Sequence, residues 1–429
     1  MSAPLRPTPP WLFGILVLPF GAAVGFLQVA VPFWLRAKGI SLVQIGAISA
    51  TGFAPHALKI FWVPLIDLGP WRKVWYLTAA LATGVLLAAS AMLANPAQHL
   101  ALFTLLITGA QAAAATTAAS LNALMATTTR AEDKGRAGGF YMAGNLGGTG
   151  VLGSLALKLA DVASGQTAGL TLGAICVGSS LCGLGIVENT GGVLAARGER
   201  LLRFVGARLV SMFKDVLSIV LTREGLTGLL ICLAPVGCGA LSNLFTAFAQ
   251  DYRVSADMTS FVSGIGGGIA GAVGSVLGGY LADRFNRRFM YCLAGALSAL
   301  CAGVMSFAPV SPATYVVGTL LYLLANGFAF AAFAGFVLEM VSKGAAVSTK
   351  YALFVASSNF SINYTTYLDG RASAYGWLSH LGSVASIKFD ALITFAGVGF
   401  VAVMTLVSRR LFQAPAPVPS PVPSKVSSP

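Results

Sequence analysis

Gly279-Tyr280-Leu281-Ala282-Asp283-Arg284-Phe285-Asn286-Arg287-Arg288 is a charged stretch between two apolar runs, 258–282 and 289–307. Each run has about the 20 apolar residues that an α-helix needs to cross a bilayer. A short charged turn between two such runs predicts that the chain leaves and re-enters a membrane here. A related pattern follows the apolar run 42–65, where Asp67, Arg72 and Lys73 occur.

The composition of the whole chain agrees with a membrane protein. Of its 429 residues, 56% are hydrophobic and only 10% are charged, whereas soluble domains carry about 25% charged residues. The net charge of +13 arises mainly from loops between apolar runs, so we expect no nucleic-acid partner. Three histidines and six cysteines without a C-x-x-C pair predict no metal site, no cofactor and no catalytic triad.

Twelve apolar runs can be read along the chain. We therefore predict an all-α integral membrane protein with twelve transmembrane helices in two six-helix pseudo-repeats. The predicted spans are 11–35, 42–65, 74–94, 100–126, 137–159, 167–187, 226–249, 258–282, 289–307, 315–338, 351–368 and 387–407.

The basic residues are distributed unevenly between the two sides of this arrangement. With both termini cytoplasmic, 20 of the 27 Lys and Arg residues lie in inner loops and tails, and six lie outside. Lys59 remains within a span. The positive-inside rule therefore predicts a multi-pass protein of the inner (plasma) membrane with cytoplasmic termini, which we expect to be monomeric.

An internal repeat predicts the domain boundaries. Asp67 and Asp283 follow equivalent spans 216 residues apart, which is close to half the chain length. We expect an N-terminal half over 1–189 and a C-terminal half over 224–411. Residues 190–223 form a cytoplasmic linker in which apolar residues recur at helical spacing, as in an amphipathic helix on the membrane surface. The Pro/Ser-rich tail 412–429 is predicted to be disordered.

The stretch 279–288 resembles the G-x-x-x-D-R-x-G-R-R signature of the major facilitator superfamily. Asn286 replaces the second glycine and is expected to tolerate a positive φ in a tight turn. The resemblance implies alternating access and a charged gate at the inner end, with Glu339 as a partner of Arg287 or Arg288, and with Arg72 or Lys73 facing Glu132 or Asp133. The predicted gating residues are Asp67, Arg72, Lys73, Gly279, Asp283, Arg284, Arg287, Arg288 and Glu339.

A second motif, Lys59-Ile60-Phe61-Trp62-Val63-Pro64-Leu65-Ile66-Asp67, reads K-x-x-W-x-P-x-x-D. It is similar to the subgroup of that superfamily that contains AmpG-type muropeptide permeases and acetyl-coenzyme A transporters. The resemblance implies a fairly large substrate such as a muropeptide, a siderophore or an acyl-coenzyme A.

Lys59 draws attention without any resemblance. It lies eight residues before Asp67, about 12 Å into the membrane along an α-helix. A cation at that depth is costly and points to a function. His56 precedes it by three residues, which places a titratable pair on one helix face. The alternatives are that Lys59 extends to the headgroups or pairs with a buried carboxylate.

Polar residues in other spans are candidates for the wall of a central binding cavity. Each amide has the alternative role of a hydrogen bond between helices. Asn359, Asn363 and Tyr367 recur every four residues in span eleven, and Asp369 and Arg371 at its end are read as an outer gate or a local ion pair. The predicted substrate-binding residues are Lys59, His56, Gln28, Gln111, Asn122, Asn243, Asn326, Asn359 and Asn363.

These features together predict a secondary transporter of an anionic or zwitterionic solute. The sequence contains no Walker motif, so direct ATP hydrolysis is not expected, and transport is either proton-coupled or driven by the gradient of the solute. Two alternatives stay open: a drug or metabolite exporter of the same fold, and a non-transporting membrane receptor or membrane enzyme.

Overall fold

The computed structural model describes residues 8–68, 72–93, 98–130, 133–187, 220–341 and 347–412, with single residues between 207 and 218. Within these ranges the secondary structure is entirely helical. The first bundle consists of α1 (Leu12–Leu16), α2 (Leu18–Gly25), η1 (Phe26–Ala30), α3 (Val31–Ala37), α4 (Leu42–Leu58), η2 (Lys59–Phe61), η3 (Val63–Leu68), α5 (Arg72–Ala91), α6 (Leu100–Thr128), α7 (Lys134–Val162), α8 (Gly165–Cys182) and η5 (Gly183–Gly185).

The second bundle begins at α10. It consists of α10 (Arg223–Leu233), η6 (Ala240–Asn243), α11 (Phe245–Phe248), α12 (Ala256–Ser260), η7 (Phe261–Gly266), α13 (Gly267–Arg284), α14 (Arg287–Phe307), α15 (Pro312–Val341), α16 (Val347–Arg371), η8 (Ala372–Ala374), η9 (Ser379–Leu381) and α17 (Ser383–Phe412). The described residues thus make the twelve predicted passes, and the all-helical fold class is confirmed.

Eight of the described passes are long and apolar enough to cross a membrane by length and composition alone. The other four are α4 with η2 and η3, α7, α10 with η6 and α11, and α16. All four line the central cavity or contact the opposite bundle. Their hydropathy is lower because part of their surface faces polar neighbours instead of lipid.

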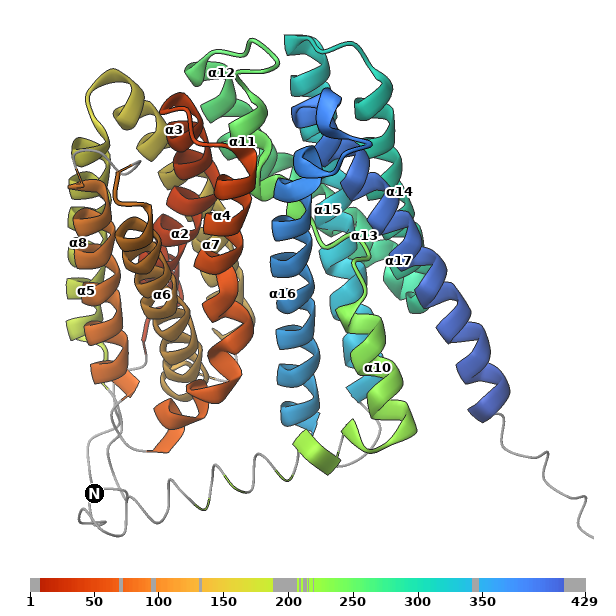
Figure 1. Cartoon of the computed structure of the whole chain (residues 1–429). Coiled ribbons are helices and arrows are strands. Elements are labelled where there is room, and N and C mark those ends of the chain that lie inside the picture. The colour runs from red at the N-terminus through yellow and green to blue at the C-terminus, as the bar shows by residue number, and fades with distance from the viewer. Residues whose placement is uncertain are drawn as a thin grey trace, which may run out of the picture.

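Figure 1 shows the two bundles standing side by side, with α4 and α16 adjacent where they meet. The end at which η5 finishes and α10 begins is called the linker end. The opposite end, near α3, α12 and η8, is called the distal end. Most of the predicted linker helix, and the predicted disordered tail from 413 onward, lie outside the described residues.

The seventh pass is broken in the middle, whereas the sequence predicted one continuous span over 226–249. The helix stops after Leu233, and Gly237 and Gly239 take positive φ angles of 55° and 70° before η6 begins. Two carbonyl oxygens freed by the break accept hydrogen bonds from α16. Tyr364 Oη donates to Leu233 O at 2.7 Å, and Ser361 Oγ donates to Ala234 O at 3.2 Å. Irregular backbone is therefore tolerated here because protein groups satisfy it.

Two π-helical segments flank the same region. η1 interrupts the first pass and η7 interrupts the eighth. A π turn widens the helix and redirects side chains, and such turns are frequent at functional sites. Both segments contribute cavity-lining residues, namely Gln28 from η1 and Ser263 from η7.

Candidate functional site

A central cavity of about 480 Å³ lies between the bundles. Its volume is within the range of sites for small organic ligands. Both bundles contribute to its wall, and apolar groups such as Phe20, Phe53 and Phe330 separate the polar ones. The polar lining residues are Gln28, His56, Lys59, Asn145, Thr149, Ser242, Asn243, Ser263, Ser275, Asn326, Asn359 and Asn363.

Seven of the nine predicted substrate-binding residues are brought together in this wall, and two are not. Gln111 is fully buried behind the wall, and Asn122 is exposed beside Tyr141. Tyr367, the third member of the predicted polar stripe, is not among the described residues that line the cavity, and its hydroxyl accepts a hydrogen bond from Arg371. The residues in the wall are Gln28, His56, Lys59, Asn243, Asn326, Asn359 and Asn363.

His56 is held by a chain of hydrogen bonds. Gln111 Nε2 donates to Ala23 O at 2.7 Å, which leaves Gln111 Oε1 to accept at 2.9 Å from His56 Nε2. Because an amide oxygen only accepts, the imidazole carries a proton on Nε2 in this contact. The ring of Phe20 meets the imidazole edge-on, with centroids 5.6 Å apart. Gln111 thus orients His56 from behind the cavity.

Lys59 lies where the α-helix of the second pass ends. The backbone tightens into η2 and η3, so Lys59 caps α4 instead of lying within a regular helix as predicted. Trp62 Nε1 donates to Thr116 Oγ1 at 3.0 Å and anchors this irregular segment to α6. Among the residues that the structure describes, no carboxylate or hydrogen-bond acceptor pairs with the Lys59 ammonium, which borders the cavity.

Several wall amides form contacts between helices. Gln28 Nε2 donates to Ser242 Oγ at 2.9 Å, and Asn359 Nδ2 donates to His56 O at 3.0 Å, both between bundles. Asn243 Nδ2 donates to Thr366 Oγ1 at 3.0 Å. Asn363 Nδ2 is buried and has no hydrogen-bond partner in the described part of the chain.

Asn326 owes its position to a glycine. A Cβ at Gly239 would overlap the Asn326 side-chain amide, so no side chain fits at position 239. The positive φ of Gly239 also favours glycine. The break in the seventh pass thus makes room for a polar group from α15 in the cavity wall.

The predicted inner gate lies at the linker end. The side chains of Asp67, Asp283 and Glu339 are outside the described residues. Arg284 lies over the ring of Tyr280, 4.3 Å from its centroid, and Arg287 lies close to Gly335 on α15. A Cβ added at Gly279 would have no neighbouring atom within 4 Å. The side chains of Arg72 and Arg288 are half-buried.

One motif residue differs from the sequence prediction, and another also makes contacts within the first bundle. Asn286 has a φ of −60°, not a positive one, and its Oδ1 accepts hydrogen bonds from the backbone N–H groups of Arg288 and Phe289. It therefore caps the N-terminus of α14. Lys73 donates to Leu184 O and Ile186 O at 2.7 and 2.9 Å, which ties α5 to the end of the sixth pass.

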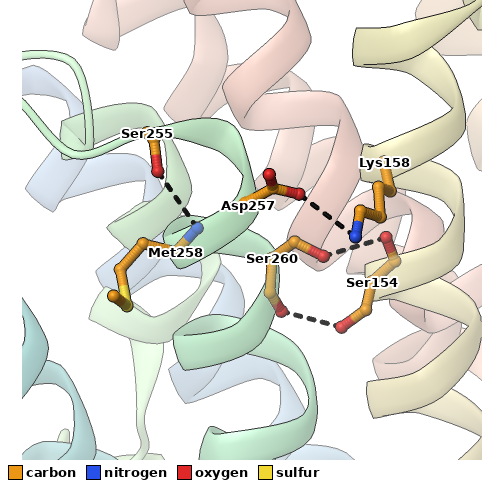
Figure 2. Close-up of polar contacts among 6 residues, drawn as sticks. All are labelled: Ser154, Lys158, Ser255, Asp257, Met258 and Ser260. Atoms are coloured by element: carbon orange, nitrogen blue, oxygen red, sulfur yellow. Dashed lines mark hydrogen bonds and ion pairs between the residues drawn. The ribbon is translucent and has the colours of Figure 1, made fainter.

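The distal end is closed by contacts between the bundles, and the sequence reasoning did not single these out. Arg36 pairs with Asp251 at 3.1 Å, and Lys158 pairs with Asp257 at 3.2 Å. Figure 2 shows the second pair beside a reciprocal contact in which Ser154 Oγ donates to Ser260 O and Ser260 Oγ donates to Ser154 O. The sequence did contain a hint of both ion pairs, because each pair joins a basic residue of the N-terminal half to an acidic residue of the C-terminal half.

Breaking the Arg36–Asp251 pair should weaken distal closure. Arg36→Glu places two negative charges together, so we expect the distal end to open more often and net transport to fall about two- to fivefold, as for a partly exposed ion pair. The double variant Arg36→Glu/Asp251→Arg should recover most of the loss. The measurement is the labelling, by an impermeant thiol reagent, of a cysteine placed at the distal end of the cavity. Equal labelling of the parent, the single variant and the double variant would contradict a role of this ion pair in distal closure.

The interpretation of Asp369 and Arg371 as an ion pair was wrong. Arg371 is exposed and its Nη1 donates to Tyr367 Oη at 2.9 Å. Asp369 is completely buried and faces Asp390 of α17, a residue that the sequence reasoning did not consider. Residues two apart on a helix point in different directions, which is why the neighbouring charges do not meet.

Two helical bundles around a central cavity that is closed at one end define a multi-pass membrane transporter fold. The chain belongs to the Major Facilitator Superfamily, whose sequence profile matches residues 13–362. The fold is also similar to that of a D-xylose-proton symporter, with a TM-score of 0.70, 12% identity and coverage of 91% of this chain and 96% of that one.

Two further solved structures extend the similarity to other transporters. The nucleoside transporter NupG has a TM-score of 0.68 at 11% identity, with 94% of this chain and 99% of that one covered. A bacterial homolog of the human lysosomal transporter Spinster, in an inward-facing and unoccupied conformation, has a TM-score of 0.65 at 15% identity, with 95% and 98% covered. At these identities the similarity concerns the fold.

Proposed function

We propose that this superfamily member is a secondary active transporter of a small to medium-sized anionic or zwitterionic solute. The observation that carries the proposal is the Lys59 ammonium in the cavity wall, which has no counter-charge among the described residues. A cation in a low-dielectric site attracts an anion strongly. The described residues that line the cavity include no Asp or Glu, so a carboxylate or phosphate of a solute would meet no like charge from them.

The rest of the wall supports binding of a polar solute. Amides and hydroxyls from both bundles offer donors and acceptors, and the rings of Phe20, Phe53 and Phe330 offer apolar surface. Since each bundle contributes to the wall, a bound solute touches both. A rocking motion of one bundle against the other would then expose the solute to each side of the membrane in turn.

The excess of basic residues at the linker end favours a cytoplasmic location for that end. Both termini would then be cytoplasmic, and the plasma (inner) membrane is the proposed location. With the distal end closed, the arrangement corresponds to an inward-facing state. In the outward-facing state, the charged stretch 279–288 and Asp67, Arg72 and Lys73 are proposed to hold the linker end closed.

Muropeptides, siderophores and acyl-coenzyme A are the first probes, because of the K-x-x-W-x-P-x-x-D motif at 59–67. Uptake of each labelled compound into proteoliposomes would be measured with and without a protonophore. We expect counterflow of one anionic compound, and a loss of its accumulation when the proton gradient is removed. An absence of counterflow for every anionic and zwitterionic compound would contradict the proposal.

The direction of flux separates the proposal from the exporter of the same fold. Inverted vesicles present the linker end to the medium. An exporter would accumulate its solute in inverted vesicles and an importer in right-side-out vesicles. A receptor or an enzyme would show neither accumulation nor counterflow.

A further inference from the structure

Two carboxyl groups are buried together in the second bundle, beside the cavity. Asp369 lies near the distal end of α16 and Asp390 in the second turn of α17, and neither is exposed at all. The two carboxyl groups face each other. Tyr322 Oη of α15 donates to Asp390 Oδ2 at 3.2 Å. Three helices therefore enclose the pair.

No cation compensates this pair among the residues that the structure describes. Arg371 is turned outward to Tyr367, and Lys388 Nζ lies 5.5 Å from the centroid of the Phe307 ring. The titratable groups that face the pair are the Tyr322 hydroxyl and, from the broken seventh pass, the Cys238 thiol. Two adjacent carboxylates without a counter-charge cannot both stay ionised in such a site.

Unpartnered polar atoms surround the same spot. Among the described residues, both Asp369 oxygens and Asp390 Oδ1 lack hydrogen-bond partners. The same holds for Oγ1 of Thr365, which is fully buried one helical turn before Asp369. The Cys238 thiol lies near the Thr365 hydroxyl and faces both carboxyl groups, which places this hydroxyl at the same spot. A buried oxygen that accepts no hydrogen bond lowers the stability of the fold unless a ligand supplies the missing donor.

We propose that Asp369 and Asp390 form a proton-binding site that couples proton movement to the transport cycle. A hydronium ion from the aqueous phase gives up its proton, which forms an O–H bond on one carboxyl oxygen and a hydrogen bond to the other carboxyl group. Water is released, and the net charge of the pair rises from −2 to −1. Cys238 also lines the central cavity, so the pair lies next to the solute site without belonging to its wall.

The position of Asp369 connects the proton to distal closure. Its neighbour Gly370 packs against Gly46 of α4, so closely that a Cβ on Gly46 would lie 2.7 Å from Gly370 Cα. Thr366 lies one helical turn before Gly370, and its hydroxyl accepts a hydrogen bond from Asn243 of the cavity wall. The pair is buried while the distal end is closed, so this state would hold the proton, and exchange is proposed to occur when the distal end opens. This coupling role rests on the proposed transport function, but the proton site itself does not.

Infrared spectroscopy of the purified protein tests the site directly. At neutral pH we expect the carbonyl stretch of a protonated carboxylic acid, and we expect Asp369→Asn/Asp390→Asn to lose it. Each single Asn variant should fold, because an amide mimics the protonated partner. The control Asp251→Asn/Asp257→Asn should keep the band, since these acids are partly exposed and paired with cations.

The alternatives give different results. An absent band in the wild type, or a band that survives in the double variant, would overturn the proposal. Loss of the band on addition of Na⁺ would also overturn it, in favour of a metal cation. In vesicles, Asp390→Asn should keep counterflow of the transported solute and lose proton-driven accumulation. If the wild type transports nothing, the proposed function fails while the infrared result still decides the proton site.

Discussion

Lys59→Ala should raise the KM for an anionic solute about 10- to 100-fold, with little change in the amount of protein in the membrane. The estimate follows from the loss of a charge-assisted interaction of about 1.5–3 kcal/mol in a low-dielectric cavity. Lys59→Arg keeps the charge but replaces a compact ammonium by a planar guanidinium, so an intermediate KM is expected. Initial rates of uptake into proteoliposomes over a range of solute concentrations provide the measurement.

A matched lysine is available as a control. Lys388 is half-buried on α17, but its ammonium lies against the Phe307 ring and not in the cavity. Lys388→Ala should therefore leave the KM unchanged. A fall in the melting temperature of Lys59→Ala would instead indicate a structural ion pair. An unchanged KM and an unchanged melting temperature would leave a lysine that extends to the headgroups.

Gly46→Leu and Gly370→Leu should each abolish transport by holding the distal end open. The backbones of α4 and α16 cross at these two glycines, and a Cβ at either would lie 2.7 Å from the Cα of the other. A leucine there cannot be accommodated by rotation of a flexible neighbour, because the opposing atoms belong to the backbone. The state with the distal end closed thus becomes inaccessible, and the cavity should face the distal side only.

Thiol labelling measures this change. A single cysteine at Ser242, in a chain without its six native cysteines, lines the cavity. An impermeant reagent should reach it from the distal side in Gly370→Leu and not in the parent. Gly178→Leu is the control, because a Cβ at Gly178 on α8 meets no atom within 4 Å. Normal transport by Gly370→Leu at equal abundance would contradict the role of this crossing.

Much of the wall of the central cavity could be predicted from single residues. Gln28, His56 and Lys59 stood out because polar groups within apolar runs are costly unless they serve a site. Gln111 met the same criterion, yet it lies behind the wall and orients His56. Polarity within a span therefore identified residues that need a partner, but it did not indicate whether that partner is a solute or another helix.

The apolar runs by themselves predicted the helical class and the twelve passes, because burial in lipid depends on local length and hydropathy. Eight of the described passes meet that criterion in full. The break at 234–239, the distal ion pairs and the Asp369–Asp390 pair were decided only by tertiary structure. Arg36 and Asp251 are 215 residues apart, and Asp369 and Asp390 lie on separate helices. Such pairings depend on how the helices cross and rotate. The helix period determines which side chains share a face within one helix. It does not determine which faces of two helices meet, so no local sequence pattern predicts these pairings.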